Sequence, residues 1–286
     1  MDIVVFGAKG QLGQSLMDVS FKYPQHNILF TDIDTVDIRF QRQIEAFVAR
    51  NYPNVLINCA AYTAVEKAQN EVKAATELNA QAVGHIAKVA AARNIFLVHV
   101  STDYVFDGKQ SRPYRETDNI HPLSVYGRTK WKGEVEVRKS QCRAAIIRTS
   151  WLYSEYGSNF LKTMIRMADE GDEDIKVVSD QLGTPTYAYD LANTIMQIID
   201  HQEIIQEGTE TFNYSNEGVA SWYDFAVEIM QLAKKKNKIL PVPASHYPSN
   251  VKRPFQSILD KQKIKETFDI EIPHWKDALK RCIKNL

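Results

Sequence analysis

A glycine pattern follows directly after the first apolar run of the chain. Residues 3–6 form a short strand-like run, and residues 7–13 read Gly-Ala-Lys-Gly-Gln-Leu-Gly. Such a loop between a buried strand and a helix presents backbone N–H groups beside the positive helix end, where they can bind a pyrophosphate. With 12 glycines in 286 residues, chance supplies this spacing only about 0.02 times per chain. We therefore favour a dinucleotide-binding loop over a plain glycine-rich turn.

Further apolar runs in the first half are continuous rather than alternating, which is typical of strands covered on both faces. They are Asn27 to Thr31, Val55 to Ile57, Ile95 to Val100 and Ala144 to Ile147. Helix-like segments separate them, and apolar residues between Leu78 and Ala91 recur three and four apart. This alternation predicts an α/β fold with a doubly wound, Rossmann-type parallel sheet.

The pattern changes after about residue 150, where aromatic and turn residues replace the apolar runs. We expect a cofactor domain of residues 1–150 and 186–216, and a smaller, partly discontinuous α/β substrate domain of residues 151–185 and 217–286. Residues 221–236 are expected to form an amphipathic helix with Ser221 as N-cap. The lysines at 234–236 are interpreted as its solvated end.

Charge and cysteine usage exclude several classes of function. The 35 basic and 35 acidic residues cancel, so the chain lacks the positive surplus that nucleic acids and anionic membranes attract. The three cysteines are far apart and lack Cys-x-x-Cys spacing, which argues against a disulfide framework and a metal site. No apolar run is long enough to span a membrane and no signal sequence precedes the first strand. We expect a cytoplasmic protein without a bound metal.

Asp32 closes the second strand-like run, about 20 residues beyond the last glycine of the pattern. From this place a carboxylate accepts hydrogen bonds from the ribose hydroxyls of NAD(H) and repels the 2′-phosphate of NADP(H). No arginine adjoins Asp32 in the sequence. The position therefore favours NADH, although Asp32 as a turn residue and nearby acids in the same role are alternatives.

Tyr126 and Lys130 form a Tyr-x-x-x-Lys pair, which places a phenol and an ammonium one helical turn apart. The pair follows a strand that ends near Thr102, at the sheet edge where such folds bind ligands. An ammonium near a phenol favours the phenolate, and a hydroxyl can hold a substrate oxygen in line. The three residues suit the reduction of a carbonyl group, with an exposed surface pair as the alternative.

These motifs resemble those of the dTDP-4-dehydrorhamnose reductase family, a branch of the extended short-chain dehydrogenases, over essentially the whole chain. The stretches that carry the resemblance are residues 7–13, 58–65, 100–108, 126–130, 148–153, 180–186, 253–254 and 257–260. Among them, Ser-Thr-Asp-Tyr-Val-Phe-Asp-Gly at 101–108 is the most diagnostic. The resemblance implies NAD(P)H-dependent reduction of the C4 ketone of dTDP-4-dehydro-β-L-rhamnose, the last step to the dTDP-L-rhamnose of bacterial surface polysaccharides.

The resemblance also implies roles for individual residues. Thr102, Tyr126 and Lys130 would be catalytic, and Thr102, Asp103 and Trp151 would bind the sugar nucleotide. The residues assigned to the cofactor, with Gly7 and Gly13 of the glycine pattern, are Gly10, Gln11, Leu12, Asp32, Asp37, Ile38, Ala61, Tyr62, Thr63, Tyr126 and Lys130. Some members of the family form a metal-bridged dimer through a glutamate in the first helix, where this chain has Gln14 and Ser15. We therefore do not expect that dimer, and a monomer and a homodimer remain open.

Two other functions remain open at this point. A nucleotide-sugar epimerase or dehydratase shares the glycine loop and the Tyr-x-x-x-Lys pair, and a regulatory subunit can keep the fold without turnover. For Trp151, which follows the Ala144 to Ile147 run, we expect stacking on the thymine base. The alternative is a tryptophan that serves core packing.

Overall fold

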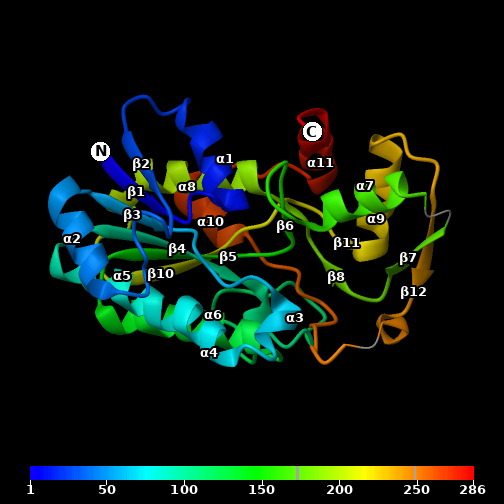
Figure 1. The fold of residues 1–286 in the computed structure, drawn as a ribbon, viewed down its shortest axis with the longest axis horizontal. Helices are drawn as coiled ribbons and strands as arrows, with labels where there is room; N and C mark the ends of the chain where they lie inside the picture. The colour runs from blue at the N-terminus through cyan, green and yellow to red at the C-terminus, as the bar shows by residue number, and fades with distance from the viewer. Residues whose placement is uncertain (172–173, 248) are drawn as a thin grey trace.

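Six parallel strands form one sheet in the larger of two lobes (Figure 1). The computed structural model describes residues 1–171, 174–247 and 249–286. The strand order is β10-β5-β4-β3-β1-β2, and all neighbouring pairs are parallel. The strands are β1 (Asp2–Phe6), β2 (Asn27–Thr31), β3 (Val55–Asn58), β4 (Phe96–Thr102), β5 (Ala144–Thr149) and β10 (Thr209–Asn213). The expected doubly wound parallel sheet is confirmed.

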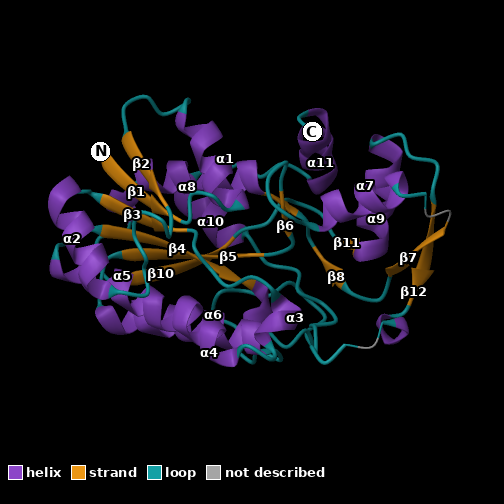
Figure 2. Cartoon of the chain, in the orientation of Figure 1, coloured by secondary structure: helices purple, strands orange, loops and turns teal. Residues whose placement is uncertain are grey.

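Helices cover both faces of this sheet (Figure 2). One layer contains α1 (Gln11–Ser20), α8 (Ala188–Asp200) and α10 (Gln262–Phe268). The other contains α2 (Gln41–Asn51), α5 (Ala82–Ala92) and α6 (Val125–Ser140). Alternate strand residues face the two layers, so that Val5 packs under α1 whereas Val4 packs on the opposite side. Burial on both faces explains why the strands are continuously apolar.

The sheet changes direction of growth between β1 and β3, and the crevice at the carboxyl ends of these strands is where such folds bind ligands. The loops that follow the two strands touch each other here. Gly7 has a φ of +81°, and a Cβ on it would lie 2.6 Å from the backbone nitrogen of Ala60. Only glycine therefore allows the loop after β1 to approach the loop after β3.

The helix expected between Leu78 and Ala91 is longer and less regular than the pattern predicts. α3 (Val65–Ala68) and α4 (Val72–Thr76) precede a π-helical turn, Glu77–Gln81, which continues directly into α5. The wider turn carries the buried side chain of Asn79. Periodicity of apolar residues does not reveal such a turn, because the apolar stripe continues through it.

The smaller lobe has a core of its own around three two-stranded pairs. Its helices are α7 (Phe160–Asp169), α9 (Trp222–Leu232) and α11 (Trp275–Lys284). The strand pairs are β6 (Leu152–Tyr153) with β9 (Thr186–Tyr187), β8 (Leu182–Gly183) with β11 (Ala220–Ser221), and β7 (Asp174–Val178) with β12 (Lys238–Val242). Short 3₁₀ turns lie at Asp103–Val105, Gln202–Ile204 and Ala244–His246. No helix among the described residues has the length and apolarity to cross a lipid bilayer.

The division of the chain into two domains by residue range stays a prediction. α8 and β10, in the 186–216 range, do pack with the large sheet. α10, however, lies in the 217–286 range and also packs there, because Ile264 and Phe268 belong to the core beneath α1 and α8. The ring of Phe268 lies edge-on to that of Phe212 in β10, with centroids 5.2 Å apart. The large lobe therefore contains one more segment, α10, than the sequence pattern predicts.

The helix expected over residues 221–236 is shorter than predicted. Its start is confirmed, since the Ser221 hydroxyl accepts from the backbone of Asp224 and the Asp224 carboxylate accepts from the backbone of Ser221. α9 ends at Leu232, and Lys234 has a left-handed φ of +55°. The lysines at 234–236 therefore follow the helix rather than form its last turn, and Lys235 forms an ion pair with Asp169.

Candidate active site

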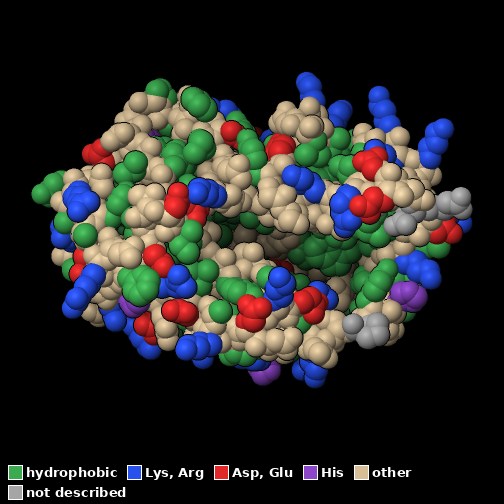
Figure 3. Space-filling view, viewed as in Figure 1, with side chains coloured by type: hydrophobic (Ala, Val, Ile, Leu, Met, Phe, Trp, Pro, Cys, Tyr) green, Lys and Arg blue, Asp and Glu red, His purple; other side chains and the backbone are tan. Residues whose placement is uncertain are grey.

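A cavity of about 770 Å³ opens between the lobes beyond the carboxyl ends of the large sheet. Figure 3 shows the molecule hollowed at this place, with hydrophobic side chains inside the hollow. The predicted site residues that line it are Gly7, Gly10, Gln11, Leu12, Asp32, Asp37, Ile38, Ala61, Thr63, Thr102, Asp103, Tyr126, Lys130 and Trp151. The fold therefore brings together residues as far apart in the chain as Gly7 and Trp151.

Two predicted cofactor residues, Gly13 and Tyr62, are not part of the lining. A Cβ on Gly13 would collide with the carbonyl oxygen of Gly7, so this glycine allows the loop to pack on α1. The backbone nitrogen of Tyr62 donates to Asn79 Oδ1 over 2.8 Å, and Asn79 Nδ2 donates to the Tyr62 carbonyl over 3.0 Å. Their direct contact with a cofactor stays a prediction, and the structure gives both a role in shaping the loops.

The N-terminus of α1 faces the cavity through Gly10, Gln11 and Leu12. Gly10 is the N-cap and no side chain of the described residues caps the helix, so the first N–H groups are available to an anion. Gln14 lies early in α1, in the place where some members of the family resembled carry a metal-bridging glutamate. Its Nε2 donates to the Lys9 carbonyl over 2.9 Å and so holds the loop. This arrangement fits the diphosphate of a dinucleotide.

Asp32 lies at the far end of the cavity from the smaller lobe. Its carboxylate accepts hydrogen bonds from the backbone nitrogens of Lys9 and Ile33, over 2.9 and 2.8 Å. The expected preference for NADH rests partly on the absence of an arginine next to Asp32 in the sequence. The loop brings the Lys9 ammonium to 3.0 Å from Asp34, and Arg39 forms an ion pair with Asp37 at 2.6 Å. Cationic side chains therefore accompany the acidic residues of this region, each in an ion pair.

Thr102, Tyr126 and Lys130 meet because α6 packs closely on the end of β4. The Ser124 hydroxyl caps α6 by accepting from the Gly127 nitrogen over 3.1 Å. A Cβ on Gly127 would collide with the Tyr104 carbonyl oxygen, so only glycine permits this approach. The Lys130 ammonium donates to the Val100 carbonyl over 2.6 Å.

The phenol of Tyr126 is held in its protonated form. Burial, helped by the charge of Asp103 and opposed by a hydrogen bond with the Thr102 hydroxyl, raises its pKa to about 12. The Tyr-x-x-x-Lys spacing predicts that the Lys130 ammonium lowers this pKa. Burial instead has the largest effect on this pKa, and the Lys130 ammonium donates a hydrogen bond to the backbone of β4. A neutral phenol at physiological pH suits a proton donor.

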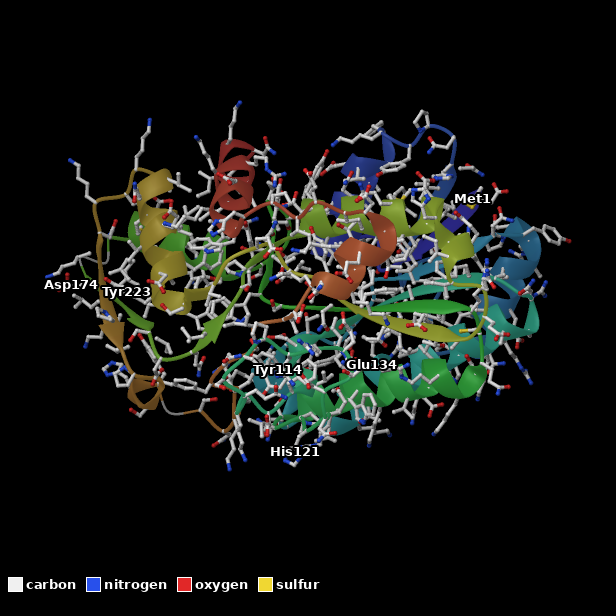
Figure 4. All side chains as sticks on the ribbon, turned by 180° about the vertical axis from the view of Figure 1, so that it is seen from behind. Met1, Tyr114, His121, Glu134, Asp174 and Tyr223 are labelled. Atoms are coloured by element: carbon white, nitrogen blue, oxygen red, sulfur yellow. The ribbon has the colours of Figure 1, made fainter. Side chains whose placement is uncertain are left out.

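Glu134 and Arg148 form a buried ion pair behind Lys130 that the sequence argument missed. Arg148 of β5 donates from Nη2 to Glu134 over 2.7 Å, and Ser101 of β4 donates to the same carboxylate over 2.6 Å. Figure 4 shows Glu134 on the side of α6 that faces the sheet. Burial lowers the pKa of Lys130 to about 8, whereas Glu134 and Cys59 raise it. Glu134 thus helps Lys130 to keep its charge.

Trp151 lies in the cavity wall with both ring faces covered. Its backbone has a left-handed φ of +47°. Its ring stacks on Trp222 with centroids 3.6 Å apart, and a Cβ on Gly183 would lie only 2.6 Å from the ring. Stacking of thymine on Trp151 therefore requires Trp222 to move, and the stacking role stays a prediction. Trp222 also lines the cavity, although no motif in the sequence singled it out.

A polar contact joins the glycine loop to the smaller lobe. Gln11 Oε1 accepts from Ser154 Oγ over 3.2 Å and from Asn159 Nδ2 over 2.8 Å. Asn159 also caps α7, since its Oδ1 accepts from the Lys162 nitrogen. The predicted cofactor residue Gln11 is therefore tied to the lobe expected to bind substrate.

Known proteins are similar to this chain over all or nearly all of its length. The family described as RmlD substrate binding domain matches residues 1–286. A dTDP-4-dehydrorhamnose reductase of Aggregatibacter actinomycetemcomitans is 39% identical over 287 residues, with 97% of each chain covered. The chain belongs to the dTDP-4-dehydrorhamnose reductase family. The family thus expected from the motifs is confirmed, and with it an NAD(P)H-dependent oxidoreductase fold.

Further relatives and solved structures match the chain over nearly its whole length. The Bacillus subtilis spore coat polysaccharide biosynthesis protein SpsK is 35% identical, with 99% of this chain and 96% of that protein covered. The crystal structure of a dTDP-4-dehydrorhamnose reductase from Bacillus anthracis in complex with NADP has a TM-score of 0.94 at 34% identity, covering 100% of this chain and 99% of that one. A dTDP-glucose 4,6-dehydratase from Streptomyces venezuelae, at 16% identity and a TM-score of 0.84, covers 99% and 96% and shares the fold alone.

Proposed function

We propose that this chain reduces the C4 ketone of dTDP-4-dehydro-β-L-rhamnose to give dTDP-L-rhamnose, with NADH or NADPH as reductant. The observation that carries this proposal is the meeting of the open glycine loop with Thr102, Tyr126 and Lys130 in one cavity. The full-length family match supports it. A cytoplasmic location and the oligomeric state stay predictions.

The residues that line the cavity have separate roles in this reaction. The reduced nicotinamide supplies a hydride to C4 when it is bound. Tyr126 then donates its phenolic proton to the oxygen of the former ketone, and Thr102 holds that oxygen in line. The Lys130 ammonium stabilises the phenolate that remains. Asp103 and Trp151 line the part of the cavity assigned to the sugar nucleotide.

The start of α1 would hold the diphosphate of the cofactor, since none of the described side chains caps this helix end. Asp32 would bind the adenosine ribose. The Bacillus anthracis relative is in complex with NADP, and the cations at Lys9 and Arg39 are consistent with use of NADPH. We propose that the chain accepts both cofactors and that Asp32 favours NADH.

The test is the oxidation of NADH and of NADPH, followed with the keto-sugar nucleotide as substrate. Tyr126→Phe removes the proton donor and keeps the ring, so the rate should fall by about 100- to 10,000-fold. Binding of the cofactor should survive. Near-normal turnover by the variant would show that Tyr126 is not the donor.

The same assay separates the two other functions considered from the sequence. An epimerase or a dehydratase regenerates its cofactor within each cycle and would consume no NADH. A regulatory subunit would bind the cofactor without any turnover. Sustained NADH oxidation that depends on the keto sugar is expected of the reductase alone.

A further inference from the structure

Residues 154–159, between β6 and α7, form a loop of the smaller lobe that contacts the start of α1. Gln11 Oε1 accepts hydrogen bonds from Ser154 Oγ over 3.2 Å and from Asn159 Nδ2 over 2.8 Å. The backbone of the loop also comes close, because a Cβ on Gly157 would lie 3.1 Å from Gln11 Cγ. The two lobes are therefore in direct contact beside the glycine loop.

Hydrogen bonds within the loop hold its shape. Asn159 Nδ2 also donates to the carbonyl oxygens of Ser154 and Tyr156, over 2.8 and 3.2 Å, and Asn159 Oδ1 caps α7. The Ser154 hydroxyl accepts from the Tyr156 nitrogen over 3.1 Å. The amide and hydroxyl that reach Gln11 are thus fixed by their own lobe, and the contact joins two ordered surfaces.

On the side of the large lobe, this contact ends at the place expected for the cofactor. Gln11 is the first residue of α1 and lines the cavity. Its backbone belongs to the helix start that fits a diphosphate, whereas its side-chain oxygen accepts from the smaller lobe. Gly157 and Asn159 line the same cavity from the opposite lobe. One residue therefore joins the cofactor side of the cavity to the smaller lobe.

On the side of the smaller lobe, both ends of the loop adjoin the aromatic wall expected to bind the sugar nucleotide. Ser154 directly follows the two-residue strand β6, and Trp151 directly precedes that strand. Asn159 precedes Phe160, whose ring centroid lies 4.7 Å from that of Trp222. Trp222 in turn stacks on Trp151. A shift of the loop relative to α1 would therefore move this wall relative to the cofactor.

We propose that Gln11 and Asn159 are positioning residues that set the distance between the reduced nicotinamide and the C4 ketone. The inference rests on the proposed reduction. The cofactor has its own platform at the glycine loop and α1, and the dTDP part of the substrate has its platform at the aromatic wall. Hydride transfer requires both platforms in one fixed relation, because a misplacement of about 1 Å can cost about 100-fold in rate. The contact therefore acts on hydride transfer rather than on the binding of either ligand.

Gln11→Met in the full chain tests this inference. Methionine has a similar length but no amide oxygen, and the backbone N–H groups of α1 and the hydrogen bonds within the loop remain. The kcat with the keto-sugar nucleotide should fall at least about tenfold. The dissociation constants of NADH and of dTDP, each measured alone by calorimetry, should stay within about threefold. The isotope effect on kcat with deuterium-labelled NADH should rise, because hydride transfer would then limit the rate.

A second variant and a control separate positioning from folding. Asn159→Asp keeps the oxygen that caps α7 and removes the amide donor to Gln11, so its kcat should fall by a similar factor. The double variant should be no slower than either single one, since both substitutions remove the same contact. Tyr156→Phe is the control. Its hydroxyl donates to Asp18 over 2.7 Å across the same boundary, and both residues lie outside the described cavity lining, so kcat should persist.

Several outcomes would overturn the inference. They are a kcat within about twofold of normal in Gln11→Met and Asn159→Asp, a lower kcat with an unchanged isotope effect, and an equal loss in Tyr156→Phe. Loss of NADH or dTDP affinity by the same factor as kcat would assign the contact to binding and overturn it too. Each of these leaves the proposed reduction intact, because the unsubstituted chain still reduces the keto sugar. Absence of that reduction in the unsubstituted chain would overturn the proposed function, and this inference with it.

Discussion

Asp32 is the residue at which a single charge should decide between the two cofactors. Its carboxylate suits ribose hydroxyls and repels a 2′-phosphate, whereas Lys9, bound to Asp34 at 3.0 Å, can attract that phosphate. We expect a higher kcat/KM with NADH than with NADPH, and Asp32→Ala should narrow or reverse this ratio. Kinetics with both cofactors before and after the substitution check it, and a preference of the unsubstituted chain for NADPH would contradict it.

Lys9→Gln is the counterpart of Asp32→Ala, because it removes a positive charge where Asp32→Ala removes a negative one. The ammonium is largely exposed, so its interaction with a 2′-phosphate is worth about 1 kcal/mol or less. The variant should therefore lose up to about fivefold in NADPH affinity. Its NADH affinity should not change, because NADH carries no phosphate at that position.

Trp151 combines a place in the cavity wall with a packed ring. If thymine displaces Trp222 and stacks on Trp151, Trp151→Ala should weaken dTDP binding by about 1–3 kcal/mol, or roughly 5- to 150-fold. NADH affinity should stay the same. A role in packing alone would cost about 3–5 kcal/mol of folding free energy. Titration of dTDP into the variant, with its melting curve measured in parallel, separates the two, and unchanged dTDP affinity would contradict the stacking role.

At the scale of elements, the position of α6 on the sheet determines the site. The Glu134–Arg148 pair joins α6 to β5, with side chains 0% and 1% exposed. Removal of one partner from such a pair leaves a buried charge uncompensated and costs about 3–5 kcal/mol. Glu134→Gln should therefore lower the free energy of unfolding by that amount, as measured by urea denaturation.

Glu136 on the same helix provides the control for this substitution. It pairs with Lys139 at 3.0 Å, but the two side chains are 33% and 67% exposed. Exposed pairs contribute about 0–1 kcal/mol, so Glu136→Gln should leave the unfolding midpoint nearly unchanged. Equal losses in the two variants would mean that the buried pair has no special role in holding α6.

The sequence predicted those elements whose signal is local. The apolar runs indicate strands such as β2 at their observed bounds, and covalent spacing on one helix brings Tyr126 and Lys130 together. The contacts that hold them are not local. Asn79 hydrogen-bonds to Tyr62, which lies 17 positions away in the chain. Arg148 hydrogen-bonds to Glu134 because β5 is paired with β4 in the sheet beneath α6. No residue pattern in one segment encodes such pairs.

At the scale of the whole molecule, the change in sequence pattern near residue 150 predicts a second, smaller lobe, and its bounds by residue range stay a prediction. The links between the lobes do not. α10 returns to the large sheet through Ile264 and Phe268, and Gln11 reaches across to Ser154 and Asn159. These two contacts depend on how the folded lobes pack against each other. Composition and periodicity of the sequence do not predict that packing.

Transfer of deuterium from NADH labelled at its transferable position tests the central claim most directly. The purified chain is incubated with labelled NADH and dTDP-4-dehydro-β-L-rhamnose, and the sugar product is examined by mass spectrometry and NMR. We predict dTDP-L-rhamnose with one deuterium at C4, formed in equal amount to the NADH consumed. A product without deuterium, or conversion of the sugar nucleotide with no loss of NADH, would contradict the proposed reduction.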